Sequence, residues 1–304
     1  MGDTYVSKLA GESAPLAMNA KLPWWLTLCA KLILARVPAP YHFWRRIGLF
    51  RHGEMNVPQK AIDTFQNYFQ CANKYASLRP GFHSLELGPG DSILSGIAAR
   101  AHGAERVWLI DVGAFASTDV TACQRVVDLL AAEGKQIPSI LGAKGLPEIL
   151  SLTGINYLTS GAVSLREIPD ASVDLFWSQV VFEHICRDEI PVVLAELRRI
   201  VKPNAVGIHG IDFRDHLGGG LNNLRFSKRI WESWIFRNSG FYTNRIQPSE
   251  MVDFFKKAGF HVRVIREMRW PSTPIDRRKL DSAFSAISDR DLLTAEIEIV
   301  ATPI

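Results

Sequence analysis

The sequence contains few cysteines, and none of them belongs to a paired motif. Its 304 residues include only Cys29, Cys71, Cys123 and Cys186, and no two of these stand in a C-x-x-C spacing. A disulfide framework or a zinc site would need clustered cysteines. The scattered positions therefore argue against both and favour buried free thiols.

Long apolar runs are also missing. The most apolar N-terminal stretch, residues 22–37, is interrupted by Lys31 and Arg36 and is too short to span a bilayer. The first twenty residues carry Asp3 and Glu12 and lack the basic start and apolar core of a signal peptide. We expect a cytoplasmic protein.

Net charge is small, at +4, but it is unevenly distributed. Residues 21–60 hold seven Lys/Arg and one acid, and residues 213–248 hold six and two. Residues 61–212 hold twelve bases and seventeen acids. Basic flanks favour an anionic substrate or an anionic surface. A solvated face without any partner explains the same pattern equally well.

The most informative stretch that is present is Ser84-Leu85-Glu86-Leu87-Gly88-Pro89-Gly90-Asp91-Ser92. It predicts a short buried strand over 83–87, a glycine turn, and a helix over 93–102 capped by Ser92 or Asp91. The third glycine of a dinucleotide fingerprint is absent, because Ile93 stands there. Glu86 beside the turn suits a cationic ligand better than a pyrophosphate. S-adenosylmethionine, with its sulfonium and ammonium groups, is such a ligand.

A second acid comes at the end of the next predicted strand. Residues 107–111 are apolar up to Asp111, which lies 21 positions after Gly90. A carboxylate at this place can accept both hydroxyl groups of a ribose. The two acids and the glycine turn therefore predict a nucleoside site.

Residues 168–185 form the second most specific feature, a turn followed by a strand and the pair Glu183-His184. With the glycine turn and Asp111, this pattern resembles the class I S-adenosylmethionine-dependent methyltransferases over roughly residues 80–212. The resemblance implies a doubly wound, mostly parallel seven-stranded α/β sheet and S-adenosylmethionine as cofactor. It implies cofactor contacts from Glu86, Gly88, Pro89, Gly90, Asp111, Val112, Ala162, Val163, Ser178 and Gln179.

Strand and helix patterns alternate along the chain, which predicts a parallel sheet with right-handed crossovers. Further strands are expected at 155–158, 205–211, 261–268 and 295–301. Helices are expected at 61–78, 118–133, 146–152, 187–201 and 249–258.

The remaining segments suggest an organisation into a lid, a domain and a cap. We expect residues 1–60 to form an N-terminal helical lid and 61–304 the methyltransferase domain, with an inserted substrate cap at 213–248. The aromatic and basic stretch 41–50 leaves a second interpretation open. In it, Trp24, Trp25 and Trp44 lie at lipid headgroups beside Arg45 and Arg46.

Candidates for the chemistry come from two places. His184 comes after the fourth strand, and Asp215 and His216 come after the fifth, where a histidine could remove a proton from the acceptor. His184 could instead shape the cofactor pocket. No metal is expected, because Val180 replaces the first acid of the E-x-x-E-H pattern of metal-binding relatives. Three arginines are candidate clamps for an anionic acceptor, unless they are merely solvated: Arg225, Arg229 and Arg245.

The sequence as a whole predicts methyl transfer to an oxygen or nitrogen of a small molecule or glycan. One alternative is a membrane-associated enzyme acting on a lipid or lipid-linked glycan. Another is a non-catalytic module that binds the same cofactor. We expect no nucleic-acid partner, because Ser178-Gln179-Val180-Val181 stands where many base methylases have an N-P-P-Y tetrapeptide.

Overall fold

The computed structural model describes residues 23–34, 36, 55–117, 119–137 and 139–304. The first twenty residues and the aromatic stretch 41–50, with Trp44, Arg45 and Arg46, lie outside the described residues. Of the expected N-terminal segment, the structure therefore describes one helix, α1 (Trp24–Leu34), and the residues that lead into the domain.

A single seven-stranded sheet forms the centre of the domain, with strand order β3-β2-β1-β4-β5-β7-β6. Six strands are parallel, and β7 runs antiparallel to its neighbours β5 and β6. The strands are β1 (His83–Leu87), β2 (Arg106–Ile110), β3 (Ile155–Leu158), β4 (Val173–Gln179), β5 (Val201–Asp212), β6 (Phe260–Arg269) and β7 (Thr294–Pro303). The predicted fold class is confirmed.

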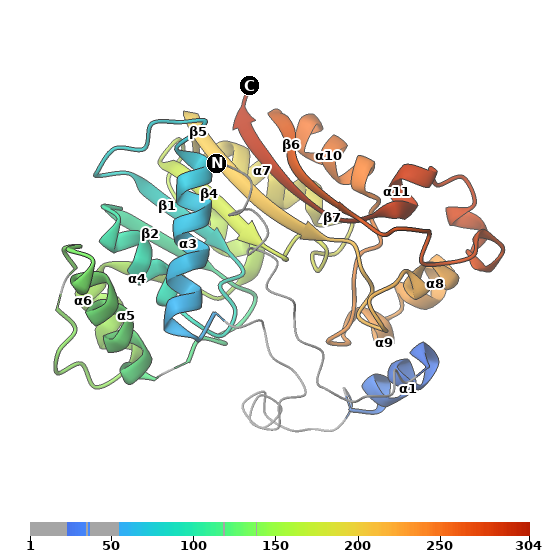
Figure 1. Ribbon diagram of the computed structural model, residues 1–304, viewed down its shortest axis with the longest axis horizontal. Helices are drawn as coiled ribbons and strands as arrows, with labels where there is room; N and C mark the ends of the chain where they lie inside the picture. Colours follow the sequence, from blue (N-terminus) through green and yellow to red (C-terminus); the bar gives the residue numbers. More distant parts are fainter. Residues whose placement is uncertain (1–22, 35, 37–54, 118, 138) are drawn as a thin grey trace.

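Helices cover both faces of the sheet (Figure 1). One face packs against α3 (Pro58–Ala72), α4 (Leu94–Ala101), α5 (Val120–Ala132) and α6 (Leu146–Thr153). The other packs against η2 (Gly161–Glu167), α7 (Ile190–Ile200) and α10 (Pro248–Lys257). Successive strand residues alternate between these two cores: Leu109 and Trp177 face the first, whereas Trp108 and Phe176 face the second.

Two element boundaries differ from expectation for local reasons. The helix α3 ends at Ala72 and not near residue 78, because the Asn73 side chain terminates it. Its amide group donates to the Phe69 carbonyl, and its oxygen accepts from the Leu78 amide at 3.1 Å. Strand β5 begins at Val201 because the chain leaves α7 directly in extended conformation, with a register shift where it pairs with β4.

The insertion expected at 213–248 packs against a second insertion, and we call the two together the cap. Residues 213–247 supply η3 (Asn222–Arg225), α8 (Lys228–Trp231) and α9 (Trp234–Arg237). Residues 270–293, between β6 and β7, add η4 (Arg277–Lys279), η5 (Ser282–Phe284) and α11 (Asp289–Leu293). Leu221 and Leu224 of the first insertion pack against Ile275 and Leu292 of the second.

Helix α1 packs on the first insertion, although it is distant in sequence. Its buried residue Leu28 joins a cluster with Leu217, Trp231 and Phe236. Trp24 packs edge to face on Phe226, with the two ring centroids 6.1 Å apart. The helix therefore belongs structurally to the cap, and Figure 1 shows it beside α8 and α9, away from the sheet.

Candidate functional site

The glycine turn after β1 is held open by Asp111. Gly88 and Gly90 adopt left-handed backbone angles, with φ of 67° and 65°. The Gly90 amide donates to Asp111 Oδ2 at 2.9 Å, and the Val112 amide donates to Oδ1 at 2.7 Å. A Cβ on Gly88 would lie 2.5 Å from a methyl group of Val181. Only glycine therefore fits at position 88, and the β4 turn packs directly on the cofactor turn.

Glu86 lies buried beneath this turn. Its carboxyl group accepts a hydrogen bond from the Ser95 hydroxyl of α4. Burial, opposed by the hydrogen bond from Ser95 and assisted by the nearby Asp111, raises the pKa of Glu86 to about 8. A nearby cation would offset much of the energetic cost of ionising this buried carboxyl group, so the site favours a positively charged ligand.

Apolar side chains flank Asp111 at the surface. Val112 is 78% exposed and Val163 of η2 is 59% exposed, although both are large and apolar. The Gly161 amide, at the start of η2, donates to the Asp111 carbonyl at 2.8 Å, which holds this wall against the β2 end. Ala162, beside Val163, is half-buried. An exposed apolar pair around a sugar-binding acid suits an aromatic base.

These residues fit S-adenosylmethionine. Asp111 would receive the ribose, Glu86 and the Gly88–Gly90 turn would receive the charged methionine part, and Val112 and Val163 would flank the adenine. Pro89 is buried within the turn. When bound, the cofactor supplies an electrophilic methyl group on its sulfonium.

The end of β4 departs from expectation in one residue. The Ser178 side chain is fully buried and points away from the cofactor edge, with its hydroxyl 2.9 Å from His209 Nδ1. Gln179 and Val180 are exposed, and Val180 has a φ of 58°, which is rare for a β-branched residue. The side chain of Ser178 is thus a core group, and Gln179 remains a candidate contact.

Two histidines from different strand ends meet at the site. His184, after β4, and His216, after β5, have their Nε2 atoms 3.3 Å apart and their rings nearly parallel. His184 Nδ1 lies 3.0 Å from the Tyr242 carbonyl, so this nitrogen carries the proton and donates. Burial lowers the pKa of His216 to about 3, with smaller effects from His184, Lys31 and Arg214. At neutral pH His216 is therefore uncharged, and its Nε2 proton points to His184.

The residue that positions His184 was not found from the sequence. Asn244 donates its side-chain amide to the carbonyls of Phe182 and Ile185, at 2.7 and 2.8 Å. Its backbone amide donates to the Glu183 carbonyl at 2.8 Å. Asn244 thus holds the turn that presents His184. An asparagine in an irregular segment carries no signal of such a role.

Asp215 is engaged in the structure of its own loop. Its carboxylate accepts from the backbone amides of Leu217 and Gly220 and also from that of Asn222. The aspartate is buried, and these bonds shape the glycine loop that carries His216. This arrangement supports a positioning role for Asp215 and not proton transfer.

A pair of buried carboxyl groups lies behind the histidines. Burial, and then the neighbouring Asp212, raise the pKa of Glu183 well above its usual range. Asp212 in turn binds the Arg214 guanidinium through both oxygens, at 2.8 Å for the Nη2 contact. The raised pKa favours the neutral form of Glu183 next to the Asp212–Arg214 pair at the end of β5.

The three candidate arginines lie in different surroundings. Arg245 is buried, stacks on Trp231 and Phe284 and pairs with Glu232, so it is a structural residue of the cap and not a clamp. The Arg225 guanidinium lies over Trp24 at 5.1 Å. Arg229 is exposed on α8. Of the three, Arg225 and Arg229 remain candidates for binding an anionic group.

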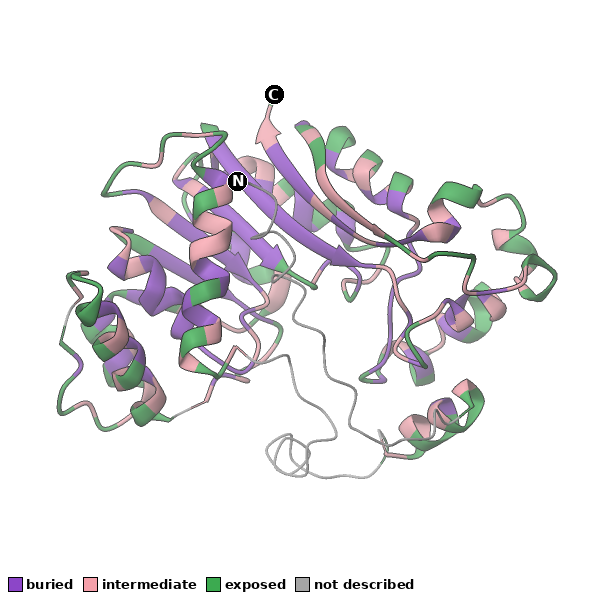
Figure 2. Ribbon diagram, in the orientation of Figure 1, coloured by how far each residue is buried: buried purple, intermediate pink, exposed green. Residues whose placement is uncertain are grey.

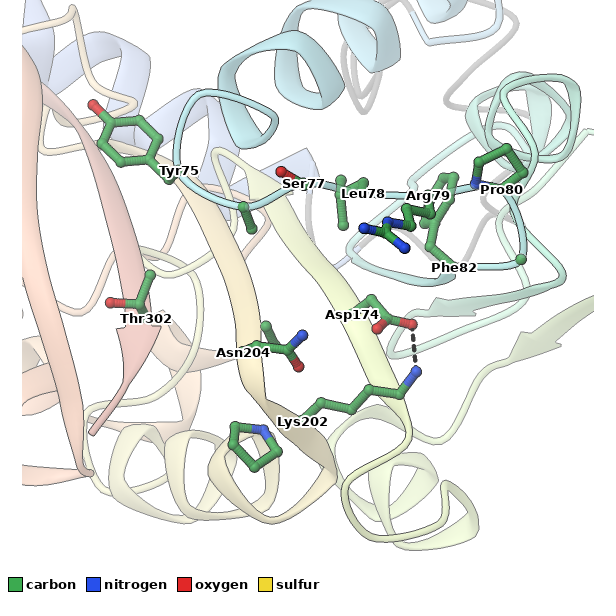
Figure 3. A pocket seen from close by; sticks show the side chains of 14 residues that line it. Tyr75, Ser77, Leu78, Arg79, Pro80, Phe82, Asp174, Lys202, Asn204 and Thr302 are labelled. Carbon is green, nitrogen blue, oxygen red and sulfur yellow. Dashed lines mark hydrogen bonds and ion pairs between the residues drawn. The ribbon is translucent and has the colours of Figure 1, made fainter.

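A hollow of about 740 Å³ lies at the opposite edge of the sheet. Figure 3 shows it at the start of β4 and β5, crossed by the ion pair between Asp174 and Lys202 at 2.7 Å. It is remote from the strand ends that carry Asp111, and parallel sheets bind ligands at those carboxyl ends. Among the described residues no cluster of His, Cys, Asp or Glu could hold a metal ion.

The sheet order, the antiparallel seventh strand and the acids at the ends of β1 and β2 define a class I methyltransferase fold. A family model described as a methyltransferase domain matches residues 85–208. The chain carries a class I S-adenosylmethionine-dependent methyltransferase domain, and S-adenosylmethionine is its cofactor. Among curated proteins, none matches the sequence.

Similar solved structures are distant in sequence. An S-adenosylmethionine-dependent methyltransferase from Archaeoglobus fulgidus is 11% identical, with 86% of this chain and 99% of that chain covered and a TM-score of 0.44. One from Methanosarcina mazei is 14% identical, with 76% and 96% covered and a TM-score of 0.42. Phosphoethanolamine N-methyltransferase 2 from Haemonchus contortus, bound to S-adenosyl-L-methionine, is 14% identical, with 88% and 61% covered and a TM-score of 0.43. These similarities do not identify the acceptor of this chain.

Proposed function

We propose that this methyltransferase modifies a hydroxyl oxygen or an amine nitrogen of a small molecule or glycan, with His184 as the proton acceptor. The observation that supports this is the His184–His216 pair. Because His184 Nδ1 donates to the Tyr242 carbonyl, its Nε2 lone pair is the basic site of the pair.

The proton can take a short path. An acceptor hydroxyl that replaces the His216 N–H as the partner of His184 Nε2 would hand its proton to that nitrogen. His216 is held neutral by its low pKa, so it adds no repelling charge before the transfer. Val181, in the turn that carries His184, touches Gly88, so the base lies close to the cofactor turn.

The cap supplies the acceptor side of the site. We assign Arg225 and Arg229 to contacts with an anionic group on the acceptor, since their helical elements η3 and α8 lie in the first cap insertion. Asp215 holds the His216 loop, and Asn244 holds the His184 turn. The proposed substrate cap therefore consists of residues 213–247 together with 270–293.

The experiment that tests the base is acceptor turnover with labelled S-adenosylmethionine, using panels of free sugars, uronic acids, phenols and amines. We expect His184→Ala to lower kcat by roughly 100-fold or more, with cofactor affinity unchanged. His261→Ala is the control, because His261 lies on β6 at the sheet edge. Full turnover by His184→Ala would refute the base role. Cofactor binding without turnover of any panel member would favour the non-catalytic alternative.

A further inference from the structure

Helix α1 turns its charged side chain inward and exposes apolar side chains, which is the reverse of an ordinary surface helix. Its sequence, Trp-Trp-Leu-Thr-Leu-Cys-Ala-Lys-Leu-Ile-Leu, contains one charged residue, Lys31. That side chain turns inward, and its Nζ donates to the His216 carbonyl at 2.7 Å. The outward side of the helix carries apolar groups, including Trp25 at 51% and Ile33 at 67% exposed. A helix facing water normally shows the opposite arrangement.

The neighbouring cap helices also carry exposed apolar residues. Trp234 on α9 is 76% exposed, although the adjacent Phe236 is buried against α1 through the Leu28 cluster. Figure 2 shows exposed residues along α1 and along the nearby cap helices. We define the apolar face by six exposed residues of α1, α8 and α9: Trp25, Leu26, Ile33, Ile230, Trp234 and Ile235.

Exposed cations border the apolar face, and the exposed Asp188 beside α9 pairs with Arg237 at 2.7 Å. Arg36, Lys228 and Arg229 are exposed beside the apolar face. The described residues 23–34 contain no acid, and within 228–240 the one acid is Glu232, which accepts from the Tyr242 hydroxyl at 2.8 Å. Exposed tryptophans with a cationic border match a membrane–water interface, where the rings lie at headgroup level and the cations meet anionic lipids.

We propose that the apolar face docks on an anionic phospholipid surface. The docking is peripheral: α1 has 11 residues, which is about 16 Å of helix against a hydrocarbon thickness of about 30 Å. Among the described helices, none combines the length and apolar character that a membrane span requires.

Docking would place the His184–His216 pair near the lipid. Lys31 joins α1 to the His216 backbone, and Tyr242, which binds His184, belongs to the same apolar cluster as Leu28. The acceptor class that this geometry favours is a hydroxyl or amine carried on a lipid or lipid-linked glycan. This assignment of the acceptor rests on the proposed function, whereas the docking itself does not.

The apolar face also revises the interfacial interpretation of the N-terminal tryptophans. Trp24 is not available to lipid, because it packs on Phe226 and beneath the Arg225 guanidinium. The lipid-facing aromatics are Trp25 and, from the distant cap, Trp234. The packing of α1 on the first cap insertion brings these two helices together.

The test is co-sedimentation of the full chain with vesicles of phosphatidylcholine, with and without phosphatidylserine, in the absence of cofactor. We expect binding that needs phosphatidylserine and falls at least tenfold in the double variant Trp25→Ala/Trp234→Ala. Lys228→Glu/Arg229→Glu should weaken it and reduce its salt dependence. The matched control is Leu141→Ala/Val192→Ala, which removes exposed apolar side chains elsewhere and should bind as the wild type does.

Three results would overturn the proposal. The first is vesicle binding that is unchanged in the tryptophan double variant although its circular dichroism is native. The second is no binding to either vesicle. The third is a dimer that the double variant dissociates, which would make the face a contact between two copies. Methyl transfer to soluble acceptors is measured separately, so a failure of docking leaves the proposed proton acceptor standing.

Discussion

The cofactor half of the site and the cap use charged residues in opposite ways. At the ends of β1 and β2, Glu86 and Asp111 are arranged around the glycine turn: Asp111 accepts from the Gly90 amide of that turn and from the Val112 amide, and Glu86 lies beneath the turn with a raised pKa. In the cap, Arg245 and Asp215 bind groups of their own segment. Charges in a regular strand–turn–helix unit therefore indicate function, whereas charges in an irregular insertion often replace missing secondary structure.

The sharpest test of this contrast is the stability of two arginine variants. We expect Arg245→Ala to lower the free energy of unfolding by roughly 3 kcal/mol, because it removes a buried donor from Glu232 and two carbonyl groups. Arg229→Ala should change it by less than about 0.5 kcal/mol, because the side chain is exposed. Urea denaturation measures both free energies of unfolding. Equal stability of the two variants would contradict the structural role assigned to Arg245.

The next effect concerns cofactor affinity. Asp111→Ala should weaken S-adenosylmethionine binding by about 100-fold, or about 2.7 kcal/mol, because it frees the glycine turn and removes the ribose partner. Calorimetry measures this. Asp119→Ala is the control, since Asp119 caps α5 from an exposed position and should leave the affinity unchanged. Wild-type affinity in Asp111→Ala would contradict the assignment.

A third test asks whether the cap positions the chemistry. Asn244→Ala should lower kcat by about 10- to 100-fold while cofactor affinity stays near wild type, because the His184 turn loses two hydrogen bonds from the asparagine side chain. The matched change is Asn238→Ala, whose side-chain amide donates to the Trp234 carbonyl in an exposed turn. If both variants retain full turnover, the hydrogen bonds from Asn244 are not needed to position the His184 turn.

The smallest expected effect is a pH dependence of cofactor binding. The pKa of Glu86 is raised to about 8, and a cationic ligand prefers the ionised carboxylate. Binding therefore releases a proton, and affinity should rise with pH up to about 8, by at most about tenfold per pH unit. S-adenosylhomocysteine, which has the same amino group but no sulfonium, provides the comparison. Glu86→Gln should reduce the difference in pH dependence between the two ligands, whereas the exposed Glu105→Gln should leave it unchanged.

Much of the sheet was predictable because its signals are local. The boundaries of β1 and β3 agree with the predicted strands, and the glycine turn and Asp111 occupy the expected strand ends. Such segments arise from apolar runs, turn residues and caps that act over a few positions. Ser178 shows the limit: the sequence places it at the right strand end, but the alternation of side chains directs its hydroxyl to His209 in the core.

The cap was predictable only as an insertion. Its elements are short, and its hydrophobic clusters join α1, residues 213–247 and residues 270–293 across the chain. No local pattern shows that Leu28 will pack on Trp231, or that Asn244 will hold the turn before His184. Long-range contacts of this kind leave no periodicity to detect.

Short motifs in the sequence were enough to specify the class of fold, the cofactor and the positions of Glu86 and Asp111 at the strand ends, since their backbone geometry is built locally. Tertiary packing was needed to bring His184 against His216, to make Arg245 structural, and to bring α1, with the exposed Trp25, against the cap helices that carry Trp234. These outcomes have a common cause. A strand end determines the position of the residues next to it, but packing between distant segments decides which side chains are left exposed to a ligand or to lipid.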